Sequence, residues 1–515
     1  MRPTTDCLRT YTSNRFNALV DMCHSQQRGG PFVRTSRKNH VFAALVAIGL
    51  IAAACGSSHK DTASSGSTGA TTTAVSTGGV TTTVGATTTT APGVKFGDLA
   101  SPCGKGDAKG ATANGVTDTS ITIGYGDDAG YAPALGLDKE MGQAMKAMIG
   151  WCNDQGGING RQIKGNYYDA KVLEIKAALT QACTDKVFMM VGQGLALDAA
   201  QEDVRIGCKL PSIPGFSASA AFAMGSGVVQ GVPNPADETP LQFAYALAKK
   251  FPESVKKVGY FYANLSATLE PMEKAKAGTP AAGFVDLKCD QVYNISGESD
   301  WKPFAENFKK CGVDFLYWVG SPEPNLENFL AAAKQVGFAP TVVFGDSNHY
   351  VSNFAKWNAQ NGNIGDNVYT RLAFAPFEEA AKTPAVQQYL DLIAKANASP
   401  ALLGMQSTGS FLLWATAVKA CGSTVTGKCV FDAIAKIDKW TAGGLHAPTN
   451  PGKNQAPDCG ILIKMTGGTF TRVDPATGFD CDPKYRATGI KTKYTDEAKI
   501  GTDRIATAFG TFTLS

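Results

Sequence analysis

The chain has 515 residues, enough for about three domains of ordinary size. Hydrophobic residues make up 43% and charged residues 18%, a balance that excludes disorder for most of the chain. The formal net charge is +4, but residues 1–54 hold seven Lys or Arg and two Asp, a surplus of five, which leaves −1 for the remainder. A nearly neutral body argues against nucleic acid as a partner. Three histidines after Ala54 are too few for a histidine-based metal site.

The N-terminus has the features of an export signal. Val41–Ala54 is an uninterrupted apolar run of 14 residues, preceded by basic residues at positions 34, 37 and 38. The run is shorter than the roughly 20 residues of a membrane-spanning helix and is typical of a signal peptide. We therefore predict that residues 1–54 are a signal peptide with an N-terminal extension.

The end of this apolar run resembles a bacterial lipobox, since three alanines precede Cys55. The resemblance implies cleavage before Cys55 and acylation of its thiol, and two acyl chains give stable anchoring to a membrane. The alternative is an ordinary signal peptide with a chance cysteine.

Residues 55–95 follow and consist almost entirely of Thr, Ser, Gly, Ala and Val. Such a segment cannot bury enough apolar surface to fold, so it is predicted to be a flexible tether.

Ten cysteines follow the tether, and none of them forms a C-x-x-C motif. An even number of cysteines in an exported chain predicts disulfides, and the missing motif argues against a zinc ribbon. Sequence does not fix the pairing; our hypothesis is that neighbours in sequence pair, and buried free thiols are the alternative. The hypothetical pairs are Cys103 with Cys152, Cys183 with Cys208, Cys289 with Cys311, Cys421 with Cys429, and Cys459 with Cys481.

From Ser120 onward, short β-rich runs alternate with helical patterns. Apolar residues recur with a helical period over 137–152, 326–336 and 386–393. This alternation predicts parallel sheets covered by helices on both faces, and the number of units favours two α/β lobes whose strand ends face a cleft. The predicted strands are Ile121–Tyr125, Ile163–Tyr168, Val187–Val191, Val258–Tyr262, Phe284–Leu287, Phe315–Val319 and Val342–Phe344.

Several motifs in this region carry a family resemblance. The most specific is Gly-Gly-Ile-Asn-Gly-Arg at 156–161, which follows an amphipathic helix; the others are 120–126, 255–262, 297–304, 311–316 and 335–340. In order and spacing they resemble type I periplasmic binding proteins of the leucine/isoleucine/valine-binding branch over residues 120–473. The resemblance implies two Rossmann-like lobes joined by three crossover segments and a cleft that closes by hinge motion. It also implies delivery of a small solute to ABC permease membrane subunits, without enzyme activity or a cofactor.

The resemblance also sets the expected boundaries of the folded body. These are 96–237 for lobe 1, 238–373 for lobe 2, 374–440 for the return to lobe 1, 441–485 for a C-terminal hairpin region of lobe 2, and 486–515 for a C-terminal tail. We expect a monomer outside the cytoplasm, anchored to the cell membrane as a lipoprotein.

A closing cleft needs polar groups on both lobes, and in the family they come from loops after successive strands. By resemblance Asp346 pairs with the ammonium of an amino acid, and Ser217 and Ser219 hold its carboxylate; a turn or cap role for Asp346 and plain loop solvation for the serines are the alternatives. The loop from Gly192 lacks a hydroxyl, which leaves an amide, a urea-like compound or a carboxylate as alternatives to the favoured branched-chain amino acid. The candidate ligand-binding residues are Asp127, Asp128, Tyr131, Gln193, Gly194, Leu195, Phe216, Ser217, Ser219, Asn264, Ser321 and Asp346.

Two enzyme classes fit the sequence poorly. Gly124–Ala129 matches a dinucleotide-binding pattern, but its two aspartates repel a pyrophosphate, and Asp169 lies at about twice the expected spacing. No G-x-S-x-G or H-E-x-x-H motif points to a hydrolase. A sensory receptor with the same fold, but without a role in transport, stays open as an alternative.

Overall fold

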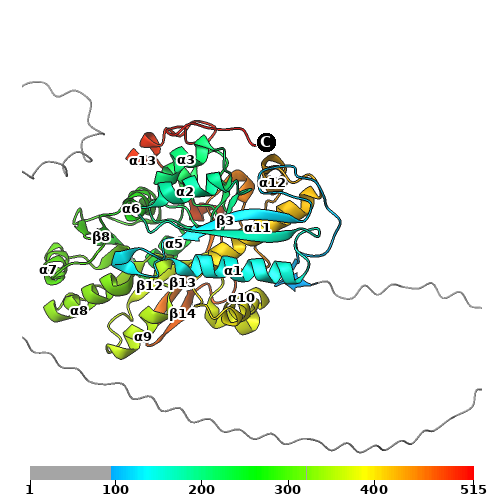
Figure 1. The fold of residues 1–515 in the computed structure, drawn as a ribbon. Helices are drawn as coiled ribbons and strands as arrows, with labels where there is room; N and C mark the ends of the chain where they lie inside the picture. The colour runs from blue at the N-terminus through cyan, green and yellow to red at the C-terminus, as the bar shows by residue number, and fades with distance from the viewer. Residues whose placement is uncertain (1–93, 321) are drawn as a thin grey trace, which may run out of the picture. The chain divides into compact units, whose positions relative to one another are not determined.

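The computed structural model describes residues 94–320 and 322–515. The expected signal peptide, Cys55 and the tether up to residue 93 lie outside these residues. The described chain forms two α/β lobes, each built on its own sheet (Figure 1). Lobe 1 has a four-stranded parallel sheet in the order β4-β3-β5-β6. Its strands are β3 (Ser120–Asp127), β4 (Gln162–Asp169), β5 (Met190–Val191) and β6 (Ser212–Ile213).

Helices cover both faces of the lobe 1 sheet, and the central strand β3 is therefore buried on both sides. On one face Ile121 and Ile123 pack in a cluster with side chains of α1 and α11. On the other face Tyr168 and Met190 pack against α2. Helix α11 is apolar all round and buried along most of its length, as expected of a helix inside a core. The helices of lobe 1 are α1 (Lys139–Asp154), α2 (Ile175–Thr184), α3 (Glu202–Gly207), α4 (Ala220–Ala223), α10 (Pro384–Lys395), α11 (Leu402–Cys421) and α12 (Gly427–Ile434).

Lobe 2 has a larger, mixed sheet in the order β14-β13-β12-β11-β10-β8-β9, with β15 paired to β13. Strands β8 to β12 are parallel, and β13 to β15 are antiparallel additions at one edge. The strands are β8 (Val258–Ala263), β9 (Gln291–Tyr293), β10 (Phe315–Val319), β11 (Val342–Gly345), β12 (Val368–Leu372), β13 (Cys459–Thr466), β14 (Thr469–Asp474) and β15 (Asp480–Cys481).

The lobe 2 helices divide between the two faces of its sheet. Phe243 and Met272, from α5 and α6, pack with Tyr317 and Phe344 on one face. Phe308 and Phe329, from α7 and α8, pack around Phe261 on the other. The helices are α5 (Gln242–Lys250), α6 (Ser266–Gly278), α7 (Lys302–Cys311), α8 (Glu327–Val336) and α9 (Ser352–Gln360). None of the described helices is both long enough and apolar enough to cross a membrane.

One predicted strand is wrong. Phe284–Leu287 has the composition of a strand, but it contributes only one isolated bridge to the sheet, and Val285 is 46% exposed. The chain turns at Lys288, which has a φ of 56°, and the next segment, β9, pairs with β8 instead. The physical reason is that Phe284–Leu287 lies beside only the first residue of β8. Within β8 it exchanges hydrogen bonds with Val258 alone, which is too few to form a strand pair.

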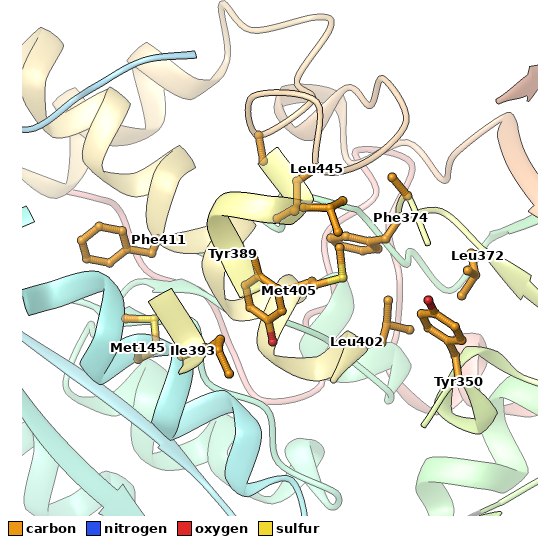
Figure 2. Packing of buried hydrophobic residues seen from close by; sticks show 14 of the residues in the cluster. Met145, Tyr350, Leu372, Phe374, Tyr389, Ile393, Leu402, Met405, Phe411 and Leu445 are labelled. Atoms are coloured by element: carbon orange, nitrogen blue, oxygen red, sulfur yellow. The ribbon is translucent and has the colours of Figure 1, made fainter. Parts of the chain in front are cut away.

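Before the C-terminal segment, three segments carry the chain between the lobes: residues 231–241, 373–377 and 446–458, named here the first, second and third crossovers. One apolar cluster continues from lobe 1 into lobe 2 along the second crossover. Figure 2 shows Met405 and Tyr389 of lobe 1 in the same buried cluster as Phe374 of this crossover. The ring of Phe377 stacks on Tyr350 at 5.0 Å and on Tyr389 at 6.1 Å between centroids. Tyr350 and Tyr389 are 2% and 1% exposed, whereas Phe377 between them is partly buried. A fully buried large side chain contributes roughly 1.5–3 kcal/mol, so the lobes share a core here.

The described residues contain five disulfides, in the sequential pairing that we predicted. Each disulfide joins two residues of the same lobe, and the sequence separations range from 8 to 49 residues. The pairs are Cys103–Cys152, Cys183–Cys208, Cys289–Cys311, Cys421–Cys429 and Cys459–Cys481.

The stabilisation by a disulfide grows with the length of the loop that it closes. For the 49-residue separation of Cys103 and Cys152 the chain-entropy estimate is about 4 kcal/mol, and for the 8-residue separation of Cys421 and Cys429 it is about 2.5 kcal/mol. We expect alanine replacement of the first pair to lower the free energy of unfolding more than replacement of the second, as measured by urea unfolding. Equal losses would contradict the loop-length account.

Candidate functional site

Asp127 and Asp128 lie at the carboxyl end of β3 and are 1% and 0% exposed. Asp127 accepts hydrogen bonds from the Gly142 N–H of α1, at 3.1 Å, and from the Tyr167 hydroxyl. Asp128 accepts N–H groups of two further loops, at 2.6 and 2.7 Å. Burial raises the pKa of both carboxyls, that of Asp127 to about 6. Both aspartates thus hold the loops of lobe 1 together, while Tyr131 beside them is partly exposed.

The loop after β5 holds Gln193, Gly194 and Leu195. The Gln193 amide donates to the Ser212 hydroxyl, and its Oε1 has no hydrogen-bond partner among the described residues. Leu195 is 3% exposed and packs in the core beside α2. A Cβ at Gly194 would lie 2.2 Å from Cε1 of Phe216, so glycine lets the Phe216 ring pack directly against this loop.

The loop after β6 was expected to hold a ligand carboxylate, and its polar groups are bonded within the protein. The Ser217 hydroxyl donates to Gln230 Oε1 at 2.9 Å, and the Ser219 hydroxyl caps α4. The Asp198 carboxylate accepts the N–H groups of Ala218, at 2.6 Å, and of Ser219, at 3.0 Å. An internal carboxylate therefore bonds two N–H groups of the loop that we predicted would hold a ligand carboxylate.

The next N–H of the same loop is bonded from the other lobe. Glu270, on α6 of lobe 2, accepts the Ala220 N–H at 2.7 Å. Burial raises the pKa of Glu270 to about 7 and that of Asp198 to about 7. The two carboxylates also repel each other, and two acids with raised pKa values therefore flank this loop. Helices α4 and α6, which follow β6 and β8, thus meet through a hydrogen bond between the lobes.

The lobe 2 candidates have partners of their own. Asp346 accepts the Ser347 N–H at 2.7 Å and lies 3.1 Å from the Arg371 guanidinium. Burial raises the pKa of Asp346, but the Arg371 charge and the Ser347 N–H outweigh burial and leave the pKa below its ordinary value. Asn264 is exposed, and its side-chain oxygen accepts the Ile295 N–H. Ser321 lies outside the described residues.

Sequence reasoning missed Glu270 and Lys274. They stand four residues apart on α6, a spacing typical of an ion pair on a solvent-facing helix surface. Instead, the Lys274 ammonium bonds Asn234 Oδ1 at 2.5 Å and the Pro235 carbonyl oxygen at 3.0 Å, both at the first crossover. Burial, with the nearby Arg371 charge, lowers the pKa of Lys274 to about 7. Pro271 lies between them, but a proline is unusual inside any helix and does not indicate that either side chain is buried.

Two hollows border these residues. A cavity of about 20 Å³, enough for one water molecule, lies between the lobes and is lined by Ser219, Ala220, Glu270 and Lys274 among others. A groove of about 610 Å³ lies on lobe 1, along α1 and the edge strand β4, with Asp127 in its wall. In the described part of the chain, no group of three or more His, Cys, Asp or Glu is arranged to hold a metal ion.

Two sheets with helices on both faces, three crossovers and polar loops that meet at the strand ends define a class of protein, the two-lobed receptor of type I topology. Residues 120–469 match the family model described as periplasmic binding protein. Since this match spans more than half of the chain, the protein belongs to the periplasmic binding protein family. No curated protein sequence matches it.

Solved structures show the same fold at low sequence identity. A fatty acid ABC transporter substrate-binding protein from Thermomonospora curvata aligns with a TM-score of 0.59 and 18% identity, over 74% of this chain and 97% of that one. A branched-chain amino acid transporter substrate-binding protein from Streptococcus pneumoniae, in complex with isoleucine, aligns with 0.55 and 17%, over 69% and 100%. A leucine-binding protein from Thermotoga maritima aligns with 0.57 and 15%, over 70% and 99%.

The packing of Phe216 against the loop after β5 can be tested at Gly194. We expect Gly194→Ala to lower the free energy of unfolding by about 1–3 kcal/mol, because the added methyl overlaps the Phe216 ring and Met141. A second change, Phe216→Ala, should relieve part of this loss. Gly150→Ala in α1 is the control, since a Cβ there meets open space. Equal melting temperatures for the Gly194 and Gly150 variants would contradict the contact.

The burial of Glu270 between the lobes predicts a pH dependence of stability. The pKa of folded Glu270 is about 7, above the ordinary value of 4.5, so the folded state binds this proton more tightly. The contribution to stability is therefore present at pH 4.5 and is lost as the pH rises towards 7. We expect Glu270→Gln to make the slope of unfolding free energy against pH less negative by roughly 1 kcal/mol per pH unit over this range. Glu273→Gln on the same helix is the control, and an unchanged slope for Glu270→Gln would refute the assignment.

Proposed function

We propose that this protein is the solute-binding component of an ABC importer and binds a small polar solute between its lobes without altering it chemically. The observation that carries the proposal is the hydrogen bond from the Ala220 N–H of lobe 1 to the Glu270 carboxylate of lobe 2. A ligand can replace a single polar bond at such a junction and thereby change the balance between lobe arrangements. Membership of a family of solute-binding proteins supports the same reading.

A branched-chain amino acid is the first candidate ligand. Asp346 follows β11 at the carboxyl edge of the lobe 2 sheet and is kept ionised by Arg371, so it can accept an ammonium group. Its pairing with Arg371 means that an ammonium would have to share the carboxylate. The similarity to binding proteins for isoleucine and leucine supports this ligand class.

A neutral amide or urea-like solute is the second candidate, and the loop after β6 favours it. The N–H groups of Ala218, Ser219 and Ala220 already bond Asp198 and Glu270. A ligand carboxylate would add a third negative charge at this loop, whereas an amide adds none and can also donate to either acid. Displacement of Glu270 in its protonated form would admit a carboxylate, so the two candidates predict different pH dependences of binding.

We further propose that the protein acts outside the cytoplasm as a monomer, attached to the membrane through lipid on Cys55. Five disulfides in the described residues support an oxidising compartment. The apolar run Val41–Ala54, which directly precedes Cys55, supports export and the anchor.

The ligand class can be tested by thermal shift. We expect one class among branched-chain amino acids, amides and short or long carboxylates to raise the melting temperature, since a ligand at 100 times its Kd adds about 2.7 kcal/mol of stability. If the ligand is an amino acid, Asp346→Asn should weaken its binding at least tenfold by calorimetry. Asp107→Asn, at an exposed carboxylate, is the control. Turnover of any compound, or no stabiliser in the screen, would overturn the receptor assignment.

A further inference from the structure

The C-terminal segment runs from lobe 2 to lobe 1 beside the crossovers. After the lobe 2 sheet, β16 (Arg486–Thr488) pairs antiparallel with β7 (Glu238–Pro240) of the first crossover. The Ile490 N–H extends this pairing by donating to the Asp237 carbonyl at 3.0 Å. Figure 1 shows the red C-terminal segment continuing from α13 (Lys493–Glu497) past α3 and ending beside α12 of lobe 1. The chain therefore connects the lobes a fourth time.

Arg504 joins two crossovers within this segment. Its guanidinium bonds both carboxylate oxygens of Asp237 at 2.8 Å and lies 3.3 Å from the Glu238 carboxylate, both in the first crossover. The same guanidinium donates to the carbonyl oxygens of Lys453, at 2.9 Å, and Asn454, at 3.0 Å, in the third crossover. Bidentate hydrogen bonds between charged groups are stronger than hydrogen bonds between neutral groups, and they fix the relative orientation of both partners.

The end of the segment is anchored on lobe 1. The Phe512 ring fills the space above Gly227, where a Cβ would lie 2.4 Å from it, and the Arg205 guanidinium stands 5.7 Å from its centroid. The Ser515 carbonyl accepts the Lys428 N–H of α12 at 3.0 Å. The segment is thus attached at its start to the first crossover and at its end to lobe 1.

We propose that residues 486–515 form a hinge strap that restricts separation of the two lobes. Rotation of the lobes requires changes of backbone dihedral angles in the crossovers. Arg504 holds the first and third crossovers together, so opening must either break these bonds or carry both crossovers as one unit. The anchor at Phe512 limits how far the strap can follow. The strap sets the range of motion whichever solute is bound, and its test needs no ligand.

The test compares Arg504→Met with Lys491→Met, which removes an exposed charge from the same segment. Hydrogen exchange of the full-length chain reports on the crossovers. We expect Arg504→Met to speed exchange of amides in both 231–241 and 446–458 at least tenfold, Arg504→Lys to have a smaller effect, and Lys491→Met to have none. Faster exchange confined to 491–515 would overturn the proposal.

A distance measurement separates hinge control from local fraying. Spin labels on noncanonical residues at the exposed positions Lys146 of α1 and Lys310 of α7 report the distance between the lobes. We expect Arg504→Met to shift the distribution towards longer distances or to broaden it. Phe512→Ala, which keeps Arg504 but removes the lobe 1 anchor, should do the same and carries the test if Arg504→Met does not fold. Distributions unchanged from the wild type in the folded variants would overturn the strap.

Discussion

The structure depends on an apolar core that does not stop at the boundary between its lobes. Tyr350 of lobe 2, Phe377 of the second crossover and Tyr389 of lobe 1 stack in series, and one buried cluster contains residues from both sheets. Removing such side chains from one another exposes apolar surface to water, which is costly. The lobes therefore stay packed along this crossover, and relative motion must leave the cluster intact.

Contacts of a different kind join the lobes where the loops after the strands meet. Glu270 bonds the Ala220 N–H, and Lys274 bonds groups of the first crossover. Water or a solute can replace these partners at small net cost, because each group finds another hydrogen bond. An apolar pivot combined with replaceable polar contacts suits a receptor whose halves part and rejoin. Here the protein's own carboxylates bond the groups that would otherwise face a ligand.

The sequence predicted the architecture because the signals for it are local and redundant. The β-rich composition of runs such as Val258–Tyr262 indicates strands, and the helical period of the apolar residues in α1 indicates a helix. An even number of cysteines in an exported chain indicated disulfides. Phe284–Leu287 failed because composition does not decide which of two nearby segments finds a full-length partner strand. The site was harder. The sequence located loops at strand ends, but not that Asp128 turns inward or that Glu270 crosses to the other lobe, since both depend on contacts between distant segments.

The covalent crosslinks follow a simple arrangement, with no disulfide of the described residues joining one lobe to the other. When a chain crosses a membrane starting from its N-terminus, the second cysteine of each pair emerges at most 49 residues after the first. Each crosslink can then form during translocation, without waiting for the distant segments that complete its lobe. Oxidation stiffens the halves separately and leaves the joint between them to the crossover segments and the non-covalent contacts around them.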